Sequence, residues 1–201
     1  MELLVATGNK KKLEEFRRIL EPLGIRVLSP GELGVALEVE ETGETFAQNA
    51  RLKAEAFFRH TGKPSVADDS GLCVDALGGR PGVCSARYQG EDAPYTEKMA
   101  ALLAELNQVP DRERGAHFTC AIHCTLGEGA EIACQDSCRG AIGRAPSGSG
   151  GFGYDPLFCV GERSFADIPP GEKDAISHRG RALRRFAALL EEYIKAEKES
   201  L

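Results

Sequence analysis

A short apolar run that leads into two adjacent carboxylates is the feature that most constrains this chain. Residues 64–67 read as a buried strand, and Asp68, Asp69, Ser70 and a glycine follow directly. Neighbouring carboxylates repel each other, so a fold rarely places them side by side for stability alone. A divalent cation would relieve the repulsion, and Mg²⁺ typically takes one or two carboxylates together with substrate phosphates. An ordinary acidic turn is the alternative, because Asp, Ser and Gly are also common turn residues.

Length and charge narrow the class of protein. The chain has 201 residues, of which 42% are hydrophobic, so we expect a single domain over residues 1–201. The net charge of −6 argues against a dedicated nucleic-acid-binding protein. The first six residues are too few and too acidic for a signal peptide, and no apolar run reaches the length of a membrane span. We therefore expect a cytoplasmic protein with neither a nucleic-acid nor a membrane partner.

The seven cysteines are expected to be reduced, because their number is odd and no secretory signal precedes them. Four of them form two C-x3-C pairs with two histidines nearby: Cys120, Cys124, Cys134, Cys138, His117 and His123. A zinc site is one interpretation, although zinc ligands usually have tighter spacing or lie in turns. Strand alternation favours the other, in which Cys120 and Cys124 are small core residues and the histidines face the opposite side.

Hydrophobic periodicity predicts alternating strands and helices early in the chain and a hairpin later. The expected strands cover residues 3–6, 25–28, 65–67, 118–126 and 131–142, and the expected helices cover residues 10–20, 46–60, 95–106 and 181 to about 198. A capping box at Thr45 and Gln48 opens the second of these helices. Early βα units followed by a hairpin indicate an α/β fold, with helices packed against a mixed sheet.

A candidate phosphate-binding loop lies where the first expected strand meets the first expected helix. Its residues are Thr7, Gly8, Asn9, Lys10, Lys11 and Lys12. A helix N-terminus offers unpaired N–H groups and the positive end of the dipole, and a glycine lets the backbone approach a ligand closely. The loop lacks the G-x-x-x-x-G-K-[ST] pattern of a Walker A loop. A solvated helix start with surface lysines is the alternative.

Two further charged features accompany this loop. Residues 38–43 form an acidic segment, and one of its glutamates is a candidate metal ligand opposite Asp68 and Asp69. Most acidic segments are simply solvated, which is the alternative. Lys53 shares the apolar face of the second expected helix, so its ammonium group must extend toward water or meet an anion.

A glycine-rich segment at residues 148–156 contains a formal G-x-G-x-x-G. We do not interpret it as a dinucleotide-binding fingerprint, because no βα unit surrounds it and a proline follows where a helix should run. Phe152 and Tyr154 are instead candidates for stacking on a base.

The segment before the last expected helix gathers hydrogen-bond donors. Lys173, His178 and Arg179 could meet the acceptors of a base edge or the phosphates of a nucleotide. Surface charge for Lys173 and Arg179, and a capping or core role for His178, are the alternatives.

In this order, these features resemble the inosine triphosphate pyrophosphatase family, which hydrolyses ITP, dITP and XTP to the monophosphate and pyrophosphate. The matching motifs are TGN at 7–9 with Lys12, EETG at 40–43, NA at 49–50 with Lys53, ADDSG at 67–71, LGG at 77–79 with PG at 81–82, SARY at 85–88, GFGYDP at 151–156 and AISHRG at 175–180. One such motif would be weak, but an ordered set covering residues 7–180 is specific.

The resemblance implies a fold and a set of roles. The implied fold is an elongated α/β protein of two lobes with the active site in the cleft between them, forming a homodimer that requires Mg²⁺. Glu40 and Asp69 are the implied metal ligands, and Asp69 is also the implied catalytic base. The implied substrate-binding residues are Thr7, Gly8, Asn9, Lys10, Lys11, Lys12, Lys53, Ser70, Phe152, Gly153, Tyr154, Asp155, Lys173, His178 and Arg179.

The expected reaction is the attack of a water molecule on the α-phosphorus, with pyrophosphate as the leaving group. Donors on His178 and Arg179 would suit the O6 acceptor of hypoxanthine or xanthine and would conflict with the N6 donor of adenine. GTP also carries O6, and the sequence does not indicate how it would be rejected.

Two other functions use some of the same residues. A phosphatase that releases the γ-phosphate, or a pyrophosphatase for pyrimidine or modified nucleotides, would need similar metal and phosphate ligands. A nucleotide-sensing module would need the phosphate loop, but would have no use for a metal-binding pair at Asp68 and Asp69. A nucleic-acid-binding protein is least compatible with the acidic balance.

Overall fold

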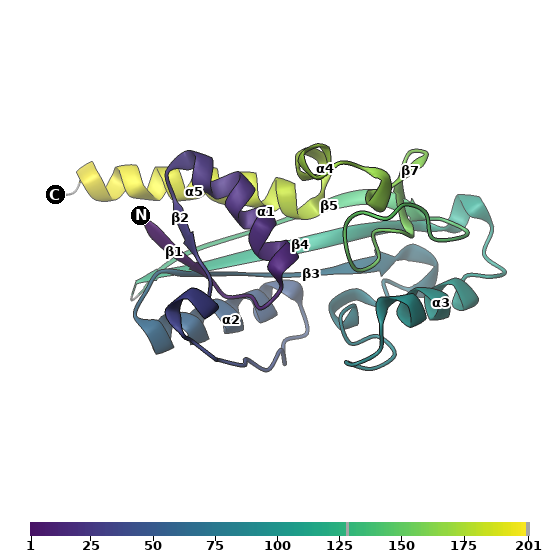
Figure 1. Cartoon of the computed structure of the whole chain (residues 1–201), viewed down its shortest axis with the longest axis horizontal. Helices are drawn as coiled ribbons and strands as arrows, with labels where there is room; N and C mark the ends of the chain where they lie inside the picture. Colours follow the sequence, from purple (N-terminus) through teal and green to yellow (C-terminus); the bar gives the residue numbers. More distant parts are fainter. Residues whose placement is uncertain (128, 200–201) are drawn as a thin grey trace. The chain divides into compact units, whose positions relative to one another are not determined.

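The computed structural model describes residues 1–127 and 129–199 and has an α/β fold (Figure 1). The strands are β1 (Glu2–Val5), β2 (Arg26–Leu28), β3 (Ser65–Val74), β4 (Gly115–Gly127), β5 (Ala130–Ile142), β6 (Phe158–Val160) and β7 (Arg163–Ser164). The α-helices are α1 (Lys10–Leu20), α2 (Phe46–Thr61), α3 (Tyr95–Glu105), α4 (Pro170–Ile176) and α5 (His178–Glu199). Among the residues described, no helix is long and apolar enough to cross a membrane.

The strands form one sheet in the order β2-β1-β3-β4-β5-β6-β7. β1 pairs in parallel with both β2 and β3, whereas β6 pairs antiparallel with β5 and β7. The expected α/β fold with a mixed sheet is therefore confirmed.

The chain divides into two compact units. The first comprises residues 1–69, 120–136 and the chain from residue 179 onward, and the second comprises residues 70–119 and 137–178. β3, β4 and β5 contribute residues to both units. The expected single domain over residues 1–201, the elongated shape and the cleft between two lobes stay predictions.

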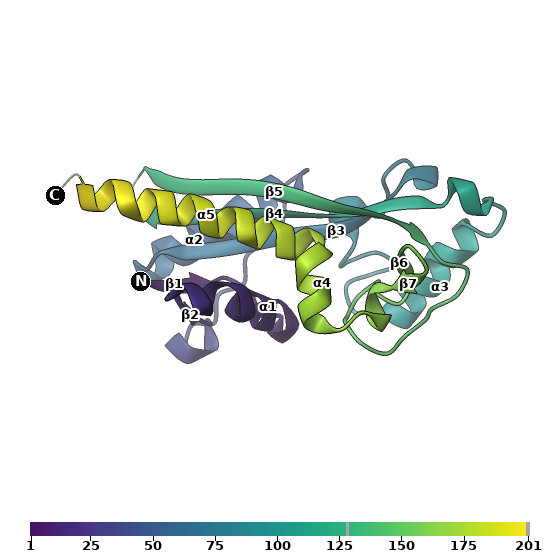
Figure 2. The same cartoon turned by 90° about the horizontal axis from the view of Figure 1, so that it is seen from above.

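The first unit has a hydrophobic layer on each face of its sheet. On one face, Leu3 of β1 packs in a cluster with Phe16 of α1 and Phe186 of α5. On the other face, Leu4 of β1 packs in a cluster with Phe57 of α2. Neighbouring residues of a strand point to opposite faces, which is why one short strand serves both layers. Figure 1 shows α5 on one side of the sheet and α2 on the other, and Figure 2 shows how far α5 extends along β4 and β5.

The cysteines behave as the strand alternation predicted. Cys120 and Cys124 are buried in the cluster beneath α5, and all seven cysteines are free. Within the described part of the chain, no group of three or more potential metal ligands includes a cysteine. The interpretation of Cys120 and Cys124 as small core residues is therefore confirmed.

The second unit has an aromatic core. The rings of Phe118 and Phe165 each lie 4.8 Å from that of Phe158, centre to centre, in edge-on contacts. Leu102 of α3 and Leu72 of β3 belong to the same buried cluster. This core supports the segments on either side of β6 and β7 that contain the remaining candidate residues.

The acid pair does not lie in a turn. β3 continues through it as a ten-residue strand, so the predicted end of the strand at Ala67 is wrong. Both Asp68 and Asp69 are buried. Their charges are compensated by residues from other elements, and this compensation allows a strand to contain two consecutive carboxylates.

Candidate active site

The loop after β1 forms a capped helix N-terminus. The Oδ1 atom of Asn9 accepts hydrogen bonds from the backbone N–H groups of Lys11 at 2.9 Å and Lys12 at 3.3 Å. The backbone N–H of Asn9 donates to Thr7 Oγ1 at 3.1 Å. The first turn of α1 contains no acidic side chain. The positive end of the α1 dipole is therefore not neutralised from within its own first turn.

A pocket of about 740 Å³ opens beside this loop. It is lined by Thr7, Gly8, Asn9, Lys10, Leu13 and Phe57, and by residues 29–31 and 35–38. The space above Gly8 is open, because a β carbon at this position would have no neighbour within 4 Å. Lys11 is exposed and lies 3.9 Å from Glu14, as the surface-lysine alternative predicts. The structure thus brings Thr7–Lys10, but not the side chain of Lys11, to one concave surface.

Asp68 lies between two cationic side chains. Its Oδ2 atom is 2.9 Å from Lys12 Nζ and 3.1 Å from Arg179 Nε. Arg179 also donates from Nη1 to Glu15 Oε2 at 2.6 Å. Burial alone would raise the pKa of Asp68, but these two cations and Lys53 hold it well below its usual range. Asp68 is therefore an anion at neutral pH, and it fixes the position of the Lys12 ammonium group.

Asp69 faces α2, because successive side chains of a strand point to opposite faces. Asn49 Nδ2 donates to Asp69 Oδ2 at 3.1 Å. Lys53 Nζ lies 3.7 Å from Asp69 Oδ1 and 2.5 Å from Glu41 Oε1. Asn49 and Lys53 are four residues apart on α2, so they lie on the same face of the helix and reach the same carboxylate.

The electrostatic environment of Asp69 differs from that of its neighbour. Burial raises the pKa of Asp69 and Glu41 adds to the effect, while Lys53 and the other donors only partly oppose it, so the pKa lies above its ordinary value. Burial lowers the pKa of Lys53, but the surrounding carboxylates more than compensate, and that pKa is also raised. Lys53 therefore remains protonated. Of the two adjacent aspartates, Asp69 is better suited than Asp68 to accept a proton.

A glycine allows this arrangement to form. The backbone N–H of Gly43 donates to Asn49 Oδ1 at 2.7 Å, which leaves the amide nitrogen of Asn49 to contact Asp69. A β carbon on Gly43 would lie 2.6 Å from the same Oδ1 atom and 2.7 Å from Gln48 Cβ. Only glycine can approach α2 this closely at residue 43.

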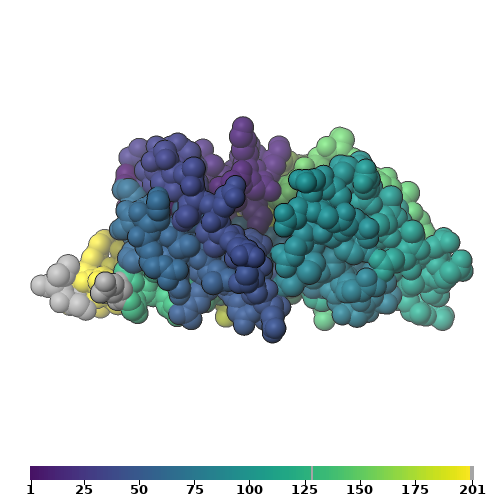
Figure 3. Space-filling model, turned by 90° about the horizontal axis from the view of Figure 1, so that it is seen from below, coloured from purple at the N-terminus to yellow at the C-terminus, as the bar shows by residue number. Residues whose placement is uncertain are grey.

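The residues around Lys53 fit a divalent cation with oxygen ligands. Carboxylates of Glu41 and Asp69 come from separate segments and converge on one position, which the Lys53 ammonium group now marks. Carboxylate oxygens are the ligands that Mg²⁺ prefers. Glu40, the residue implied by the resemblance, is exposed. The segment before α2 lies at the surface of the first unit (Figure 3). Its role as a ligand stays a prediction, and the structure adds Glu41 as a candidate.

In the second unit, Phe152, Asp155 and Lys173 lie together. Asp155 Oδ2 accepts hydrogen bonds from the backbone N–H of Phe152 at 2.8 Å and from Lys173 Nζ at 2.5 Å. Lys173 Nζ also lies 5.1 Å from the centre of the Phe152 ring, a cation–π distance. Gly151 has a φ of +68°, and a β carbon there would lie 2.1 Å from Asp155 Oδ2. This segment is thus a fixed turn held by a buried ion pair.

The other candidates of the second unit differ in exposure. His178 is buried and stacks on Phe118, with ring centres 4.6 Å apart and an angle of 13° between the rings. Tyr154 is buried in the core, and its hydroxyl donates to the backbone oxygen of Ser85 at 3.2 Å. Gly153 and Ser70 are half-buried, as is Phe152. Of the two aromatic residues, the structure therefore favours Phe152 for stacking on a base.

Sequence reasoning did not assign roles to Asn49 or Glu15, and it named Glu41 only as one of the glutamates of the acidic segment. Asn49 had a usable signal, since its spacing of four from Lys53 places both residues on one helical face. Glu15 had none, because its partner Arg179 lies 164 residues further along the chain. The same contacts give Arg179 two carboxylate partners in the first unit, and its expected contact with a base stays a prediction.

Comparisons with known proteins place these residues in a wider group. A sequence model of the Ham1 family matches residues 3–189. A dITP/XTP pyrophosphatase of Geobacillus kaustophilus is 46% identical over 195 residues, covering 96% of each chain. One from Mycobacterium tuberculosis is 49% identical over 187 residues, covering 90% of this chain and 91% of the relative. The solved structure of a HAM1 protein from Coxiella burnetii has a TM-score of 0.87 at 41% identity, covering 96% of this chain and 99% of that one.

Proposed function

The chain belongs to the Ham1 family, and we propose that it hydrolyses non-standard purine nucleoside triphosphates, such as dITP, XTP and ITP, to the monophosphate and pyrophosphate. The relatives that match almost its full length are dITP/XTP pyrophosphatases. The single observation that carries the mechanism is the convergence of Asn49, Lys53 and Glu41 on the raised-pKa carboxylate of Asp69. In this function the enzyme removes unwanted nucleotides from the pool.

We infer that the first unit binds the triphosphate. The capped N-terminus of α1 offers backbone N–H groups from the TGN loop, and Lys12 and Lys53 add two fixed positive charges. Phosphoryl and nucleotidyl transfer depend mainly on positioning and on stabilisation of charge. Local cations of this kind allow a chain of net charge −6 to bind a polyanion.

Asp69 with Glu41 or Glu40 would hold Mg²⁺. When bound, the ion supplies neutralisation of the charge on the phosphate oxygens. Lys53 contacts both Glu41 and Asp69, so its ammonium group would turn toward the phosphates when a cation occupies the carboxylates. The identity of the metal as Mg²⁺ belongs to this proposal.

Asp69 is the proposed general base. Asn49 holds its Oδ2 atom, which fixes the direction of the carboxylate. Asp69 accepts a proton from water, the water oxygen bonds to the α-phosphorus, and the bond from the α-phosphorus to the bridging oxygen breaks. The products are the nucleoside monophosphate and pyrophosphate, whose charge the nearby lysines offset.

We propose that residues of the second unit recognise the base. Phe152 offers a ring face, and Lys173 with Asp155 keeps its backbone in place. An imidazole donor on His178 would meet the O6 acceptor of hypoxanthine or xanthine and oppose the N6 amino group of adenine. Ser70 follows Asp69 directly on β3 and remains the candidate for an additional substrate contact.

Assembly and location are also part of the proposal. A homodimer is expected from the resemblance, and light scattering on the purified chain would test it through the molar mass. A cytoplasmic location is a further expectation, and fractionation of cells producing the protein would test it.

A nucleotide panel tests the proposed function. ITP, dITP, XTP, ATP and GTP are incubated with the chain and Mg²⁺, and pyrophosphate and phosphate are measured separately. We expect pyrophosphate from the first three, and an Asp69→Asn variant should lose about a hundredfold or more of the turnover. Release of single phosphates would indicate the alternative phosphatase. Nucleotide binding without turnover would indicate a sensing module.

A further inference from the structure

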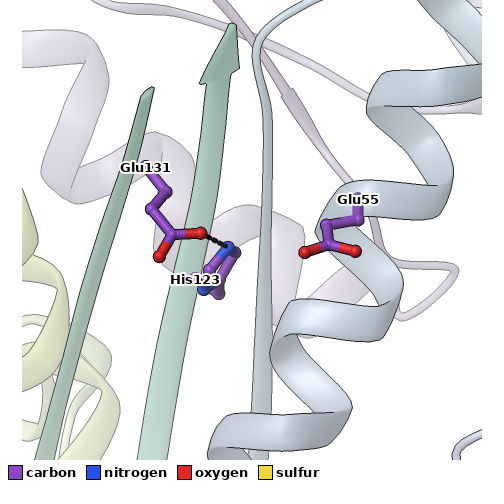
Figure 4. Close-up of side chains that lie close together, drawn as sticks. All are labelled: Glu55, His123 and Glu131. Carbon is purple, nitrogen blue, oxygen red and sulfur yellow. Dashed lines mark ion pairs between the residues drawn. The ribbon is translucent and has the colours of Figure 1, made fainter. Parts of the chain in front are cut away.

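Three side chains of the first unit that could bind a metal ion lie close together and include none of the candidate active-site residues. They are Glu55 of α2, His123 of β4 and Glu131 of β5, and one ligand atom from each lies within 4.8 Å of the other two. Figure 4 shows Glu131 and His123 on adjacent strands, with Glu55 facing them from the helix. None of the three takes part in the proposed reaction.

The imidazole of His123 is the centre of this group. Only 4% of the residue is exposed. Within the described residues, its Nε2 atom has no hydrogen-bond partner. Glu131 Oε2 lies 3.5 Å from this nitrogen, without the alignment of a hydrogen bond. A buried polar atom without a partner is costly, so an imidazole nitrogen that lies near the carboxylates of Glu55 and Glu131 without a hydrogen bond requires an explanation.

A cation would provide that explanation, and two guanidinium groups already lie nearby. Arg59 Nη1 is 3.5 Å from Glu55 Oε2, and Arg51 lies close to both carboxylates. Arg51 Nε is 2.6 Å from Glu55 Oε1, and its Nη2 is 3.8 Å from Glu131 Oε2. The Arg51 side chain is 58% exposed, so it can leave the carboxylates without disturbing the core. Positive charge is therefore stabilised between Glu55 and Glu131, but among the described residues no guanidinium donates to His123 Nε2, whereas a metal ion could bind that nitrogen directly.

We propose that Glu55, His123 and Glu131 bind a divalent transition-metal ion of the Zn²⁺ class, which links α2 to the β4–β5 hairpin. One imidazole nitrogen and two carboxylates are ligands that Zn²⁺ accepts, with water in the fourth position. Mg²⁺ prefers oxygen-only ligands and would not compete well for a site built around an imidazole. The ligand oxygens would move inward by about 1 Å, because ligands of tetrahedral zinc lie closer together than these atoms do now.

The surroundings permit the metal to enter. A pocket of about 440 Å³ reaches the group and is lined by residues that include Gln48, Arg51, His123 and Glu131. Glu55 is half-buried and Glu131 is exposed, which leaves both carboxylates free to rotate toward an ion.

The test is a zinc titration of the chain without an affinity tag, in the presence of millimolar Mg²⁺ to occupy the oxygen-only site. Nitrogen–proton NMR of the imidazole rings is the readout. The chain has only four histidines, and no candidate metal ligand of the active site is a histidine. We expect the His123 resonances alone to shift, reaching saturation at one equivalent, with a rise in melting temperature. A His123→Gln variant identifies its signals.

Two surface variants make the test specific. Glu131→Gln should weaken zinc binding by about tenfold or more, whereas Arg51→Gln should strengthen it several-fold by removing the competing cation. His60→Ala and Glu192→Gln are matched controls on exposed residues, and they should bind as the unchanged chain does. Pyrophosphate release with Mg²⁺ should be unaltered in all four variants. The proposal does not depend on the proposed function.

Three results would overturn the proposal. His123 resonances that do not move with excess Zn²⁺ would show that the imidazole is not a ligand. Equal zinc affinity in Glu131→Gln would exclude the carboxylate. If Arg51→Gln bound zinc no more tightly than the unchanged chain, the carboxylates that Arg51 contacts would not be zinc ligands.

Discussion

Adjacent residues Asp68 and Asp69 illustrate how one strand can give two carboxylates opposite properties. Asp68 faces Lys12 and Arg179, which keep it ionised, while Asp69 faces Asn49 and Lys53, and its burial together with the nearby Glu41 raises its pKa. The separation follows from the alternation of side chains along β3. One carboxylate therefore organises the cations, and the other is left with a raised pKa that suits proton transfer.

The hydrogen bond from Asn49 should tune the catalytic pKa. It favours the ionised form of Asp69, so Asn49→Ala should raise that pKa further. Because a base must be ionised to act, the acidic limb of the kcat/KM profile should move to higher pH, and turnover should fall by about 10- to 100-fold. Asn107→Ala, on an exposed asparagine, is the control. A profile that keeps its shape in Asn49→Ala would contradict the assignment.

The two aspartates should affect stability with opposite signs. The pKa of Asp68 is depressed by folding, so its contribution is present above the unfolded-state pKa of about 4 and declines as the pH falls below it. Asp68→Asn should lower the free energy of unfolding by about 3 kcal/mol or more at pH 7, because it breaks a buried ion pair, and by less in acid.

The pKa of Asp69 is raised, so its ionisation opposes folding as the pH rises. Asp69→Asn should therefore unfold at higher denaturant concentration than the unchanged chain at pH 7. Urea unfolding at several pH values measures both, and two variants that shift in the same direction at pH 7 would contradict this account.

Among the helices and strands, those fixed by neighbouring residues can be predicted from the sequence, whereas those fixed by contacts with distant residues cannot. The N-cap Asn9, the capping box at Thr45 and the bounds of α1 were predictable, because each depends on residues within one turn. The course of β3 was not, since Asp68 reads locally as a turn residue and its partner Arg179 is 111 residues away. The short helix α4 was missed because two prolines stand at its start: Pro169 is the N-cap and Pro170 is the first helical residue. Proline is nevertheless common in the first turn of a helix.

The approach of the segment before α2 to that helix is predicted to be essential. Gly43→Ala places a methyl group on Asn49 Oδ1, so Asn49 must move and Asp69 loses its donor. We expect a loss of about 1–3 kcal/mol in unfolding free energy, together with a fall in kcat. Gly127→Ala is the matched control, since a β carbon there meets nothing within 4 Å. Equal activity in the two variants would exclude a role for this contact.

The N-terminus of α1 allows capping to be separated from phosphate binding. Asn9→Ala should lower the unfolding free energy by about 1 kcal/mol through loss of the cap, and raise KM. Asn9→Asp keeps the cap and adds a negative charge beside the incoming phosphates, so KM should rise with little loss of stability. Thermal unfolding and steady-state kinetics on both variants give the two readouts. If KM rose in Asn9→Ala, which is destabilised, but not in Asn9→Asp, which is not, phosphate binding at this helix would be contradicted.

At the scale of the whole molecule, the chain is acidic, yet its candidate site gathers cations. Lys12, Lys53 and the α1 dipole lie in the first unit, and the aromatic and imidazole groups proposed for the base lie in the second. The resemblance supplied the substrate and most of the roles, whereas the residues alone indicated a metal and phosphate site. The structure added the carboxylate and amide partners that support Asp69, and not Asp68, as the proposed base.

Isotope labelling tests the central claim most directly. Hydrolysis of dITP in water enriched in oxygen-18, with Mg²⁺, is followed by mass spectrometry of both products. Attack on the α-phosphorus predicts one heavy oxygen in the monophosphate and none in the pyrophosphate. The Asp69→Asn variant should form much less labelled monophosphate, whereas the control variant Asn107→Ala should form as much as the unchanged chain. Heavy oxygen found in the pyrophosphate, or in released single phosphate, would contradict the account.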